Sequence, residues 1–113
     1  MEKDKSGIRM EYESKLHSEE MNFLFDAVLS LESREECYRF FEDICTVSEQ
    51  KALAQRIKVA QMLDENATYQ EISKSTGAST ATISRVNRCL AYGSGGYRTV
   101  LDRVKRRTGA GDK

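Results

Sequence analysis

Apolar residues recur at helical spacing through the first half of the chain. Between Leu16 and Leu31 most of them lie three or four positions apart, with Glu20 as one exception. Ser33 and Glu36 then have the spacing of a capping box, the pairing that satisfies backbone N–H groups at the start of a helix. An unbroken apolar stripe follows this box, made of Cys37, Phe40, Phe41, Ile44 and Cys45. The pattern predicts two antiparallel helices, joined by a short corner, within residues 15–45.

Two further capping boxes mark helix starts in the second half. Thr46 with Glu49 opens one helix, and Thr68 with Glu71 opens a shorter one. Two more helices follow, and all four have apolar residues at helical spacing. The residues expected to face inward are, in chain order, Leu53, Ile57, Ala60, Leu63, Ile72, Ile83, Val86, Leu90, Tyr97, Val100, Leu101 and Val104.

Glycine and hydroxyl residues set the boundaries between these helices. Gly77 suits a left-handed helix end, and Ser79 can cap the next helix. The Gly-rich run 93–96 separates the last two helices, and the absence of proline leaves every helix unbroken. We therefore predict an all-α fold of six helices in one domain, residues 15–108. A flexible arm, 1–14, and a flexible tail, 109–113, are expected to flank it.

The charges are unevenly distributed, although the formal net charge is zero. Residues 1–50 hold 6 Lys/Arg against 13 Asp/Glu, a net charge of −7. Residues 51–113 hold 12 Lys/Arg against 5 Asp/Glu, a net charge of +7. A basic half is what binding to a polyanion requires, so the distribution favours nucleic acid as a partner.

Several classes of function lack the residues that they need. The three cysteines, Cys37, Cys45 and Cys89, are too widely spaced for a CxxC motif, and their odd number suits reduced thiols in a cytoplasm. Because His17 is the single histidine, we expect no metal site. No nucleophile–base pair or phosphate-binding loop is recognisable, so we expect no catalytic residue and no cofactor. No secretion signal or membrane span is predicted, which indicates a cytoplasmic protein.

Residues 69–91 have the pattern of a helix-turn-helix, two short helices joined by a turn that contains glycine. The second helix presents short side chains at its N-terminus and arginines farther along. A recognition helix contacts bases through its N-terminal residues, and arginine pairs with guanine or phosphate. The candidate DNA contacts are Tyr69, Gln70, Thr80, Ala81, Thr82, Ser84, Arg85 and Arg88.

The same stretch is depleted of acidic residues. Residues 72–101 contain no Asp or Glu while they carry Lys74, Arg85, Arg88 and Arg98. A phosphate-binding surface requires this depletion, whereas a solvated face normally mixes both signs. We therefore expect double-stranded DNA as the partner. The alternative is a helical protein-interaction module whose basic helices bind an acidic protein.

Two segments carry a family resemblance: Thr46-Val-Ser-Glu-Gln-Lys-Ala-Leu-Ala-Gln-Arg-Ile-Lys-Val-Ala60 and Thr76-Gly-Ala-Ser-Thr-Ala-Thr-Ile-Ser-Arg85. The sequence resembles the Trp repressor superfamily, particularly its Trp-repressor-like branch of uncertain effector. The resemblance implies a six-helix subunit and an intertwined homodimer in which helices of residues 15–45 wrap the partner. It also implies a sequence-specific transcriptional regulator, a repressor, that binds a palindromic operator.

The resemblance further implies an effector pocket. In the family two arginines sandwich the indole of tryptophan; Arg56 and Arg85 stand at the matching positions, and Thr46 matches another lining residue. The sequence departs from the tryptophan-responsive members at Val86, where they have glycine, and at Cys89, where they have serine. Because protein interiors are close-packed, a β-branched side chain at 86 would occupy space that indole needs. We expect that L-tryptophan is not the effector, with a tryptophan-responsive repressor as the alternative.

Overall fold

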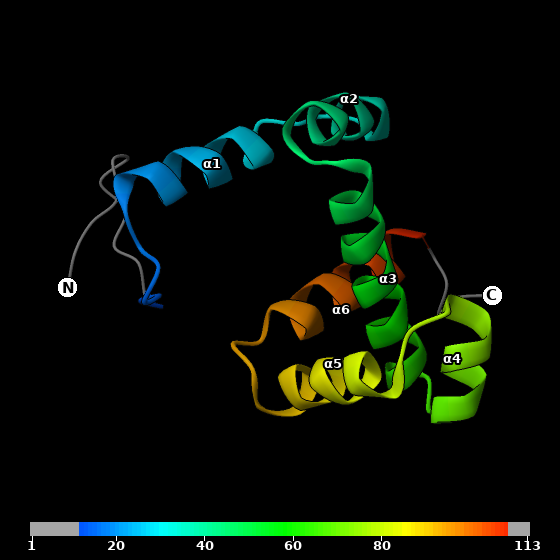
Figure 1. Ribbon diagram of the computed structural model, residues 1–113. Coiled ribbons are helices and arrows are strands. Elements are labelled where there is room, and N and C mark those ends of the chain that lie inside the picture. The colour runs from blue at the N-terminus through cyan, green and yellow to red at the C-terminus, as the bar shows by residue number, and fades with distance from the viewer. Residues whose placement is uncertain (1–11, 109–113) are drawn as a thin grey trace. The chain divides into compact units, whose positions relative to one another are not determined.

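Six α-helices and no strand make up residues 12–108, the part of the chain that the structure, a computed structural model, describes (Figure 1). The helices are α1 (Glu19–Leu29), α2 (Arg34–Ile44), α3 (Val47–Asp64), α4 (Tyr69–Thr76), α5 (Thr80–Tyr92) and α6 (Gly96–Thr108). The predicted all-α class and helix count are confirmed. Most of the expected arm, 1–14, and all of the expected tail, 109–113, lie outside the described residues.

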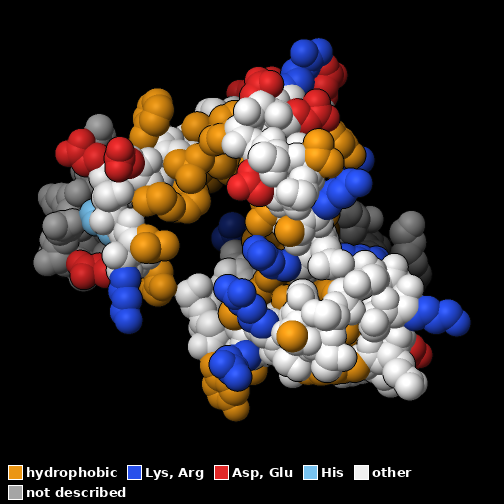
Figure 2. Space-filling view, in the orientation of Figure 1, with side chains coloured by type: hydrophobic (Ala, Val, Ile, Leu, Met, Phe, Trp, Pro, Cys, Tyr) orange, Lys and Arg blue, Asp and Glu red, His pale blue; other side chains and the backbone are white. Residues whose placement is uncertain are grey.

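The chain divides into two compact units, Met1–Ile44 and Cys45–Lys113. The described part of the first unit holds α1 and α2, and neither helix has a buried residue. Phe23 is 73% exposed and Leu29 81% exposed, and orange apolar side chains line the surface of α1 in Figure 2. Among the described residues α1 and α2 do not pack against one another. The predicted antiparallel pair is therefore wrong, and neither apolar stripe is buried.

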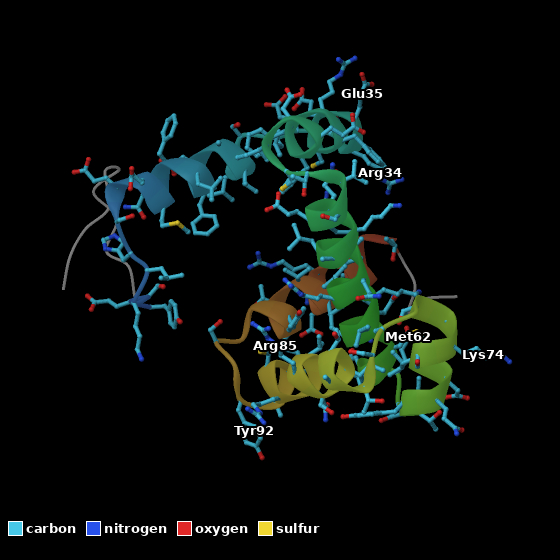
Figure 3. The ribbon with its side chains drawn as sticks, in the orientation of Figure 1. Arg34, Glu35, Met62, Lys74, Arg85 and Tyr92 are labelled. Atoms are coloured by element: carbon cyan, nitrogen blue, oxygen red, sulfur yellow. The ribbon has the colours of Figure 1, made fainter. Side chains whose placement is uncertain are left out.

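The second unit is built around α3, which packs against α4, α5 and α6. Its core consists of Val59, Ala60, Ile72, Ala78, Ile83, Val86 and Leu101. Leu63, Leu90 and Tyr97 are partly buried against this core, as is Met62, which is labelled in Figure 3. Most of the inward positions expected from the sequence are thus confirmed, and they hold the helix-turn-helix to α3.

The faces of α3 and α6 differ from the sequence pattern. Leu53 and Ile57 on α3, and Val100 and Val104 on α6, are exposed by 37% to 47%. Val59, which was not expected to face inward, is completely buried. Because α3 has neighbours on more than one side, a single apolar stripe does not describe which of its residues are covered.

Hydroxyl caps start the helices as the sequence predicts, with one partial exception. Both halves of the capping box are present at Thr46 and at Thr68. At α2, Ser33 Oγ accepts the N–H of Glu36 at 3.1 Å, but the Glu36 carboxylate accepts the N–H of Glu32, at 2.8 Å. Only half of that predicted box forms, because the carboxylate reaches one residue further back.

Candidate DNA-binding surface

The turn between α4 and α5 has the geometry of a helix-turn-helix. Gly77 ends α4 in the left-handed region, at φ 75°, where a residue with a Cβ is strained. Ser79 then caps α5, and its Oγ accepts the N–H of Thr82 at 3.1 Å. Ile72 on α4 and Ile83 on α5 are both completely buried, so the two helices share one core.

The outward face of α5 carries most of the candidate DNA contacts. Thr80, Ala81, Ser84, Arg85 and Arg88 are exposed, from the first residue of the helix to its third turn. Thr82 is only partly exposed, and its Oγ1 accepts a hydrogen bond from the Ser79 hydroxyl at 3.1 Å. The exposed residues form a surface of short polar side chains followed by two arginines. This order matches the way in which a recognition helix approaches a groove.

Tyr69 and Gln70 bring the start of α4 to the same region. Both are exposed, and the Tyr69 hydroxyl accepts a hydrogen bond from Asn87 Nδ2 at 3.4 Å. This bond links the first residue of α4 to the outward face of α5. The sequence reasoning did not select Asn87, whose amide in an acid-free stretch was the only available signal. The Tyr69 hydroxyl proton stays free to donate to a phosphate.

The cations of the acid-free stretch fall into two groups. Lys74, Arg85 and Arg88 are exposed and have no acidic partner among residues 12–108. In Figure 3 Lys74 extends outward from α4, and Arg85 lies over α5. Arg98 differs, because Asp64 lies 2.8 Å from its guanidinium and Asp102 3.5 Å from it. Three of the four cations thus remain available to phosphate.

Asp64 pairs with Arg98 and with a second cation of α6. Its carboxylate also lies 3.8 Å from Lys105 Nζ. The hydrogen bond from Arg98 is the main cause that holds the pKa of Asp64 below its ordinary value, although partial burial acts in the opposite direction. The same hydrogen bond raises the pKa of Arg98. Both groups stay charged at neutral pH and neutralise one another.

The residues of the expected effector pocket differ in exposure and in the contacts that they make. The Thr46 hydroxyl caps α3, because its Oγ1 accepts the N–H of Glu49 at 3.1 Å. Arg56 and Arg85 are exposed on α3 and α5, two helices that pack directly together. Val86 is only 3% exposed and belongs to the core. Its side chain is therefore not available as the open wall of a pocket.

Cys89 alone among the expected pocket residues lines an open hollow between α3, α5 and α6. The other residues that line it are Ile57, Gly93, Ser94, Gly96, Tyr97 and Val100. The sequence analysis did not select these residues as a site, and it expected Ile57, Tyr97 and Val100 to face the core. The hollow is mostly apolar, and no charged residue lines it.

Two other kinds of site have no candidate in the part of the chain that the structure describes. No group of three or more His, Cys, Asp or Glu residues there is arranged to hold a metal ion. None of the helices found between residues 12 and 108 is both long and apolar enough to cross a membrane.

Comparison with known proteins identifies the relatives of this fold. A family model described as Trp repressor protein matches residues 19–105. A protein of Bacillus subtilis (strain 168), the uncharacterized protein YerC, is 58% identical over 91 residues, which cover 80% of this chain and 88% of the relative.

Two solved structures are similar in both sequence and fold. A crystal structure of a candidate Trp repressor from Staphylococcus aureus superposes with a TM-score of 0.77 at 52% identity, covering 80% of this chain and 90% of that one. A TrpR-like protein from Eubacterium eligens ATCC 27750 gives a TM-score of 0.75 at 54% identity, covering 84% of this chain and 94% of that one.

Proposed function

The chain belongs to the Trp repressor family of DNA-binding transcriptional regulators, and on that basis we propose that it binds a specific operator as a homodimer and represses transcription there. The family is one of regulators and not of enzymes. The observation that carries the proposal is the outward face of α5, where short polar side chains precede two arginines without acidic partners among the described residues. We also propose a cytoplasmic location, as the sequence predicts, because a DNA-binding regulator must reach the chromosome.

In the proposed complex α5 enters the major groove. Thr80, Ala81 and Ser84 are short enough for the helix to approach the base edges closely, and the threonine methyl group can contact a thymine methyl. Arg85 and Arg88 lie farther along the same face, where a guanidinium can pair with guanine or with phosphate. In this proposal Tyr69 and Gln70, at the start of α4, contact the DNA backbone and so fix the register of the protein on the duplex.

The proposed homodimer forms through α1 and α2. Their apolar stripes are uncovered, and each large apolar side chain removed from water contributes about 1.5–3 kcal/mol. The second unit has its own uncovered apolar residues, Leu53 and Ile57 on α3 and Val100 and Val104 on α6. The two ends of the chain also carry opposite net charge. In the proposed dimer a second copy covers the apolar residues of both units and pairs the oppositely charged ends. The two-fold symmetry of such a dimer explains why we expect a palindromic operator.

We also propose that L-tryptophan is not the effector. By the family resemblance Val86 stands where tryptophan-responsive members have glycine, and it packs in the same core as Ile83 and Val59. Forcing a ring into packed space costs about 1–3 kcal/mol. The recognition helix is thus held against α3 by a side chain of its own. A tryptophan-responsive repressor is the first alternative, and a basic module that binds an acidic protein is the second.

A selection of bound sites from random duplex DNA tests the proposal. We expect the selected sites to share a palindrome whose half-sites lie about one helical turn, or 10 base pairs, apart. Affinity for the selected duplex should fall steeply with salt and should exceed the affinity for a scrambled duplex by about 1,000-fold or more. Equal affinity for both duplexes, together with tight binding to an acidic protein, would favour the interaction module.

A further inference from the structure

The recognition helix depends on the turn before it for its direction. Val86 and Ile83 fix the middle of α5 in the core, but its first residues, Thr80 and Ala81, lie beyond these anchors and are exposed. The position of this end is therefore set by the three residues that join α4 to α5. The last carbonyl groups of a helix lack donors within the helix, and they need partners elsewhere.

Gln55 on α3 supplies such a partner to the end of α4. Its Nε2 donates to the backbone oxygen of Thr76, the last residue of α4, at 3.1 Å. Gln55 is partly buried, and 21 positions of sequence separate it from Thr76. The bond therefore connects the central helix of the unit directly to the turn of the helix-turn-helix. A hydrogen bond that is shielded from water is less easily replaced by solvent.

Thr76 extends this contact through its side chain. Its hydroxyl donates to the backbone oxygen of Ile72 at 2.8 Å and accepts the N–H of Ala78 at 3.1 Å. Ala78, in the middle of the turn, is only 2% exposed, so this N–H would otherwise be left without a partner. Both polar groups of Thr76 are thus engaged, one with α3 and the other with α4 and the turn.

We propose that Gln55 is a positioning residue for DNA recognition, acting through Thr76 on the exposed N-terminal end of α5. The DNA part of this inference rests on the proposed function. The Gln55 side chain makes no hydrogen bond to a candidate DNA contact, and its effect passes through the backbone of the turn. Loss of the bond leaves the core unchanged but lets the first turn of α5 take several directions, of which one fits the groove. Sequence-specific contacts need that one direction, whereas contacts to phosphate tolerate several.

The test compares two glutamines on the same helix. Gln61 is the matched control, because its Oε1 accepts a hydrogen bond from Lys58, three positions away, and makes no bond to the turn. We expect Gln55→Ala to lower affinity for the selected duplex about three- to tenfold, the equivalent of one hydrogen bond, and to leave affinity for a scrambled duplex unchanged. Gln61→Ala should change neither affinity.

A second substitution separates the hydrogen bond from packing. Gln55→Glu keeps the shape of the side chain, but a carboxylate cannot donate a proton to the Thr76 carbonyl. We expect Gln55→Glu to lose at least as much affinity for the selected duplex as Gln55→Ala. Binding as tight as the parent's would overturn the proposal. Circular dichroism of both variants checks that the helices remain formed.

Amide hydrogen exchange provides a readout that does not need DNA. In Gln55→Ala the amides of Gly77 and Ala78 should exchange faster than in Gln61→Ala, while the amide of Ile83, inside α5, should be unchanged. Equal exchange in the two variants would overturn the role of Gln55 in holding the turn. A parent protein without preference for any duplex would overturn the proposed function and the DNA role of Gln55 with it, and exchange would still decide whether Gln55 holds the turn.

Discussion

Arg98 Nη2 lies 2.8 Å from Asp64 Oδ1, and this contact ties the start of α6 to the last residue of α3. The side chain of Asp64 is 15% exposed, and the other carboxylate oxygen faces Lys105 Nζ at 3.8 Å. Two cations of α6 thus share one carboxylate. The contact adds to the packing of Leu101 and Tyr97, which hold α6 to the core beside α3.

The Asp64–Arg98 contact predicts a specific dependence of stability on pH. The pKa of Asp64 is lowered from an ordinary value of 3.8, so its stabilising effect is fully present above that value and is lost as pH falls below it. Asp64→Asn should lower the Tm at pH 7 by about 2–6 °C, as expected for a partly exposed ion pair. Melting curves by circular dichroism should show that the difference from the parent shrinks below pH 4. A difference that stays constant down to pH 3 would contradict the assignment.

Arg88 and Arg98 offer a matched pair for testing DNA contact. Both are exposed arginines in the acid-free stretch, but only Arg98 is neutralised by carboxylates. If Arg88 contacts a phosphate, Arg88→Ala should weaken binding to every duplex and reduce the slope of log affinity against log salt by about one. Arg98→Ala should leave the slope unchanged. Fluorescence anisotropy titrations at several salt concentrations measure both, and equal slopes for the two variants would refute this distinction.

The proposed dimer predicts a mass and a way to disrupt it. Sedimentation should give about twice the subunit mass of 12.8 kDa. Phe23, which is 73% exposed in the single chain, would be covered by the second copy. Phe23→Glu should therefore shift the equilibrium to monomer and weaken operator binding, because it places a charge in an apolar interface. A parent that sediments as a monomer at micromolar concentration would exclude the dimer.

The burial of Val86 leads to a prediction about the binding of L-tryptophan. Calorimetry with L-tryptophan should show no saturable heat below millimolar concentration, since the strain of about 1–3 kcal/mol expected from overpacking corresponds to about a tenfold or greater loss of affinity. Val86→Gly removes the side chain that fills the core and should create weak binding. Micromolar binding by the parent that also tightens the DNA complex would establish the tryptophan-responsive alternative.

Features encoded by short stretches of sequence could be predicted, and features that join distant residues could not. The ends of α4 and the start of α5 follow from Thr68, Gly77 and Ser79, whose effects act within a few residues. The contact of Gln55 with the Thr76 carbonyl gave no sequence signal, because it joins a side chain to a backbone atom 21 positions away. The pairing of Asp64 with Arg98 was missed for a similar reason. Asp64 lies outside the acid-free stretch, and that stretch suggested that Arg98 was free to bind phosphate.

The packing of helices was the least predictable part of the fold. Apolar spacing located α1 and α2, but the antiparallel pair inferred from it does not form among the described residues. In α3, burial of the adjacent residues Val59 and Ala60 depends on helices arriving from two sides. A pattern along one helix records which residues are apolar, whereas the neighbours decide which of them lose contact with water.

The burial of Val86 has a consequence for how such a regulator could be controlled. If α5 is the recognition helix, as we propose, the buried Val86 holds it in the core without any bound metabolite. Occupancy of the operator would then follow the amount of protein in the cell. For a weakly associated dimer the concentration of the active form rises with the square of the subunit concentration, so modest changes in synthesis or proteolysis would be amplified at the promoter.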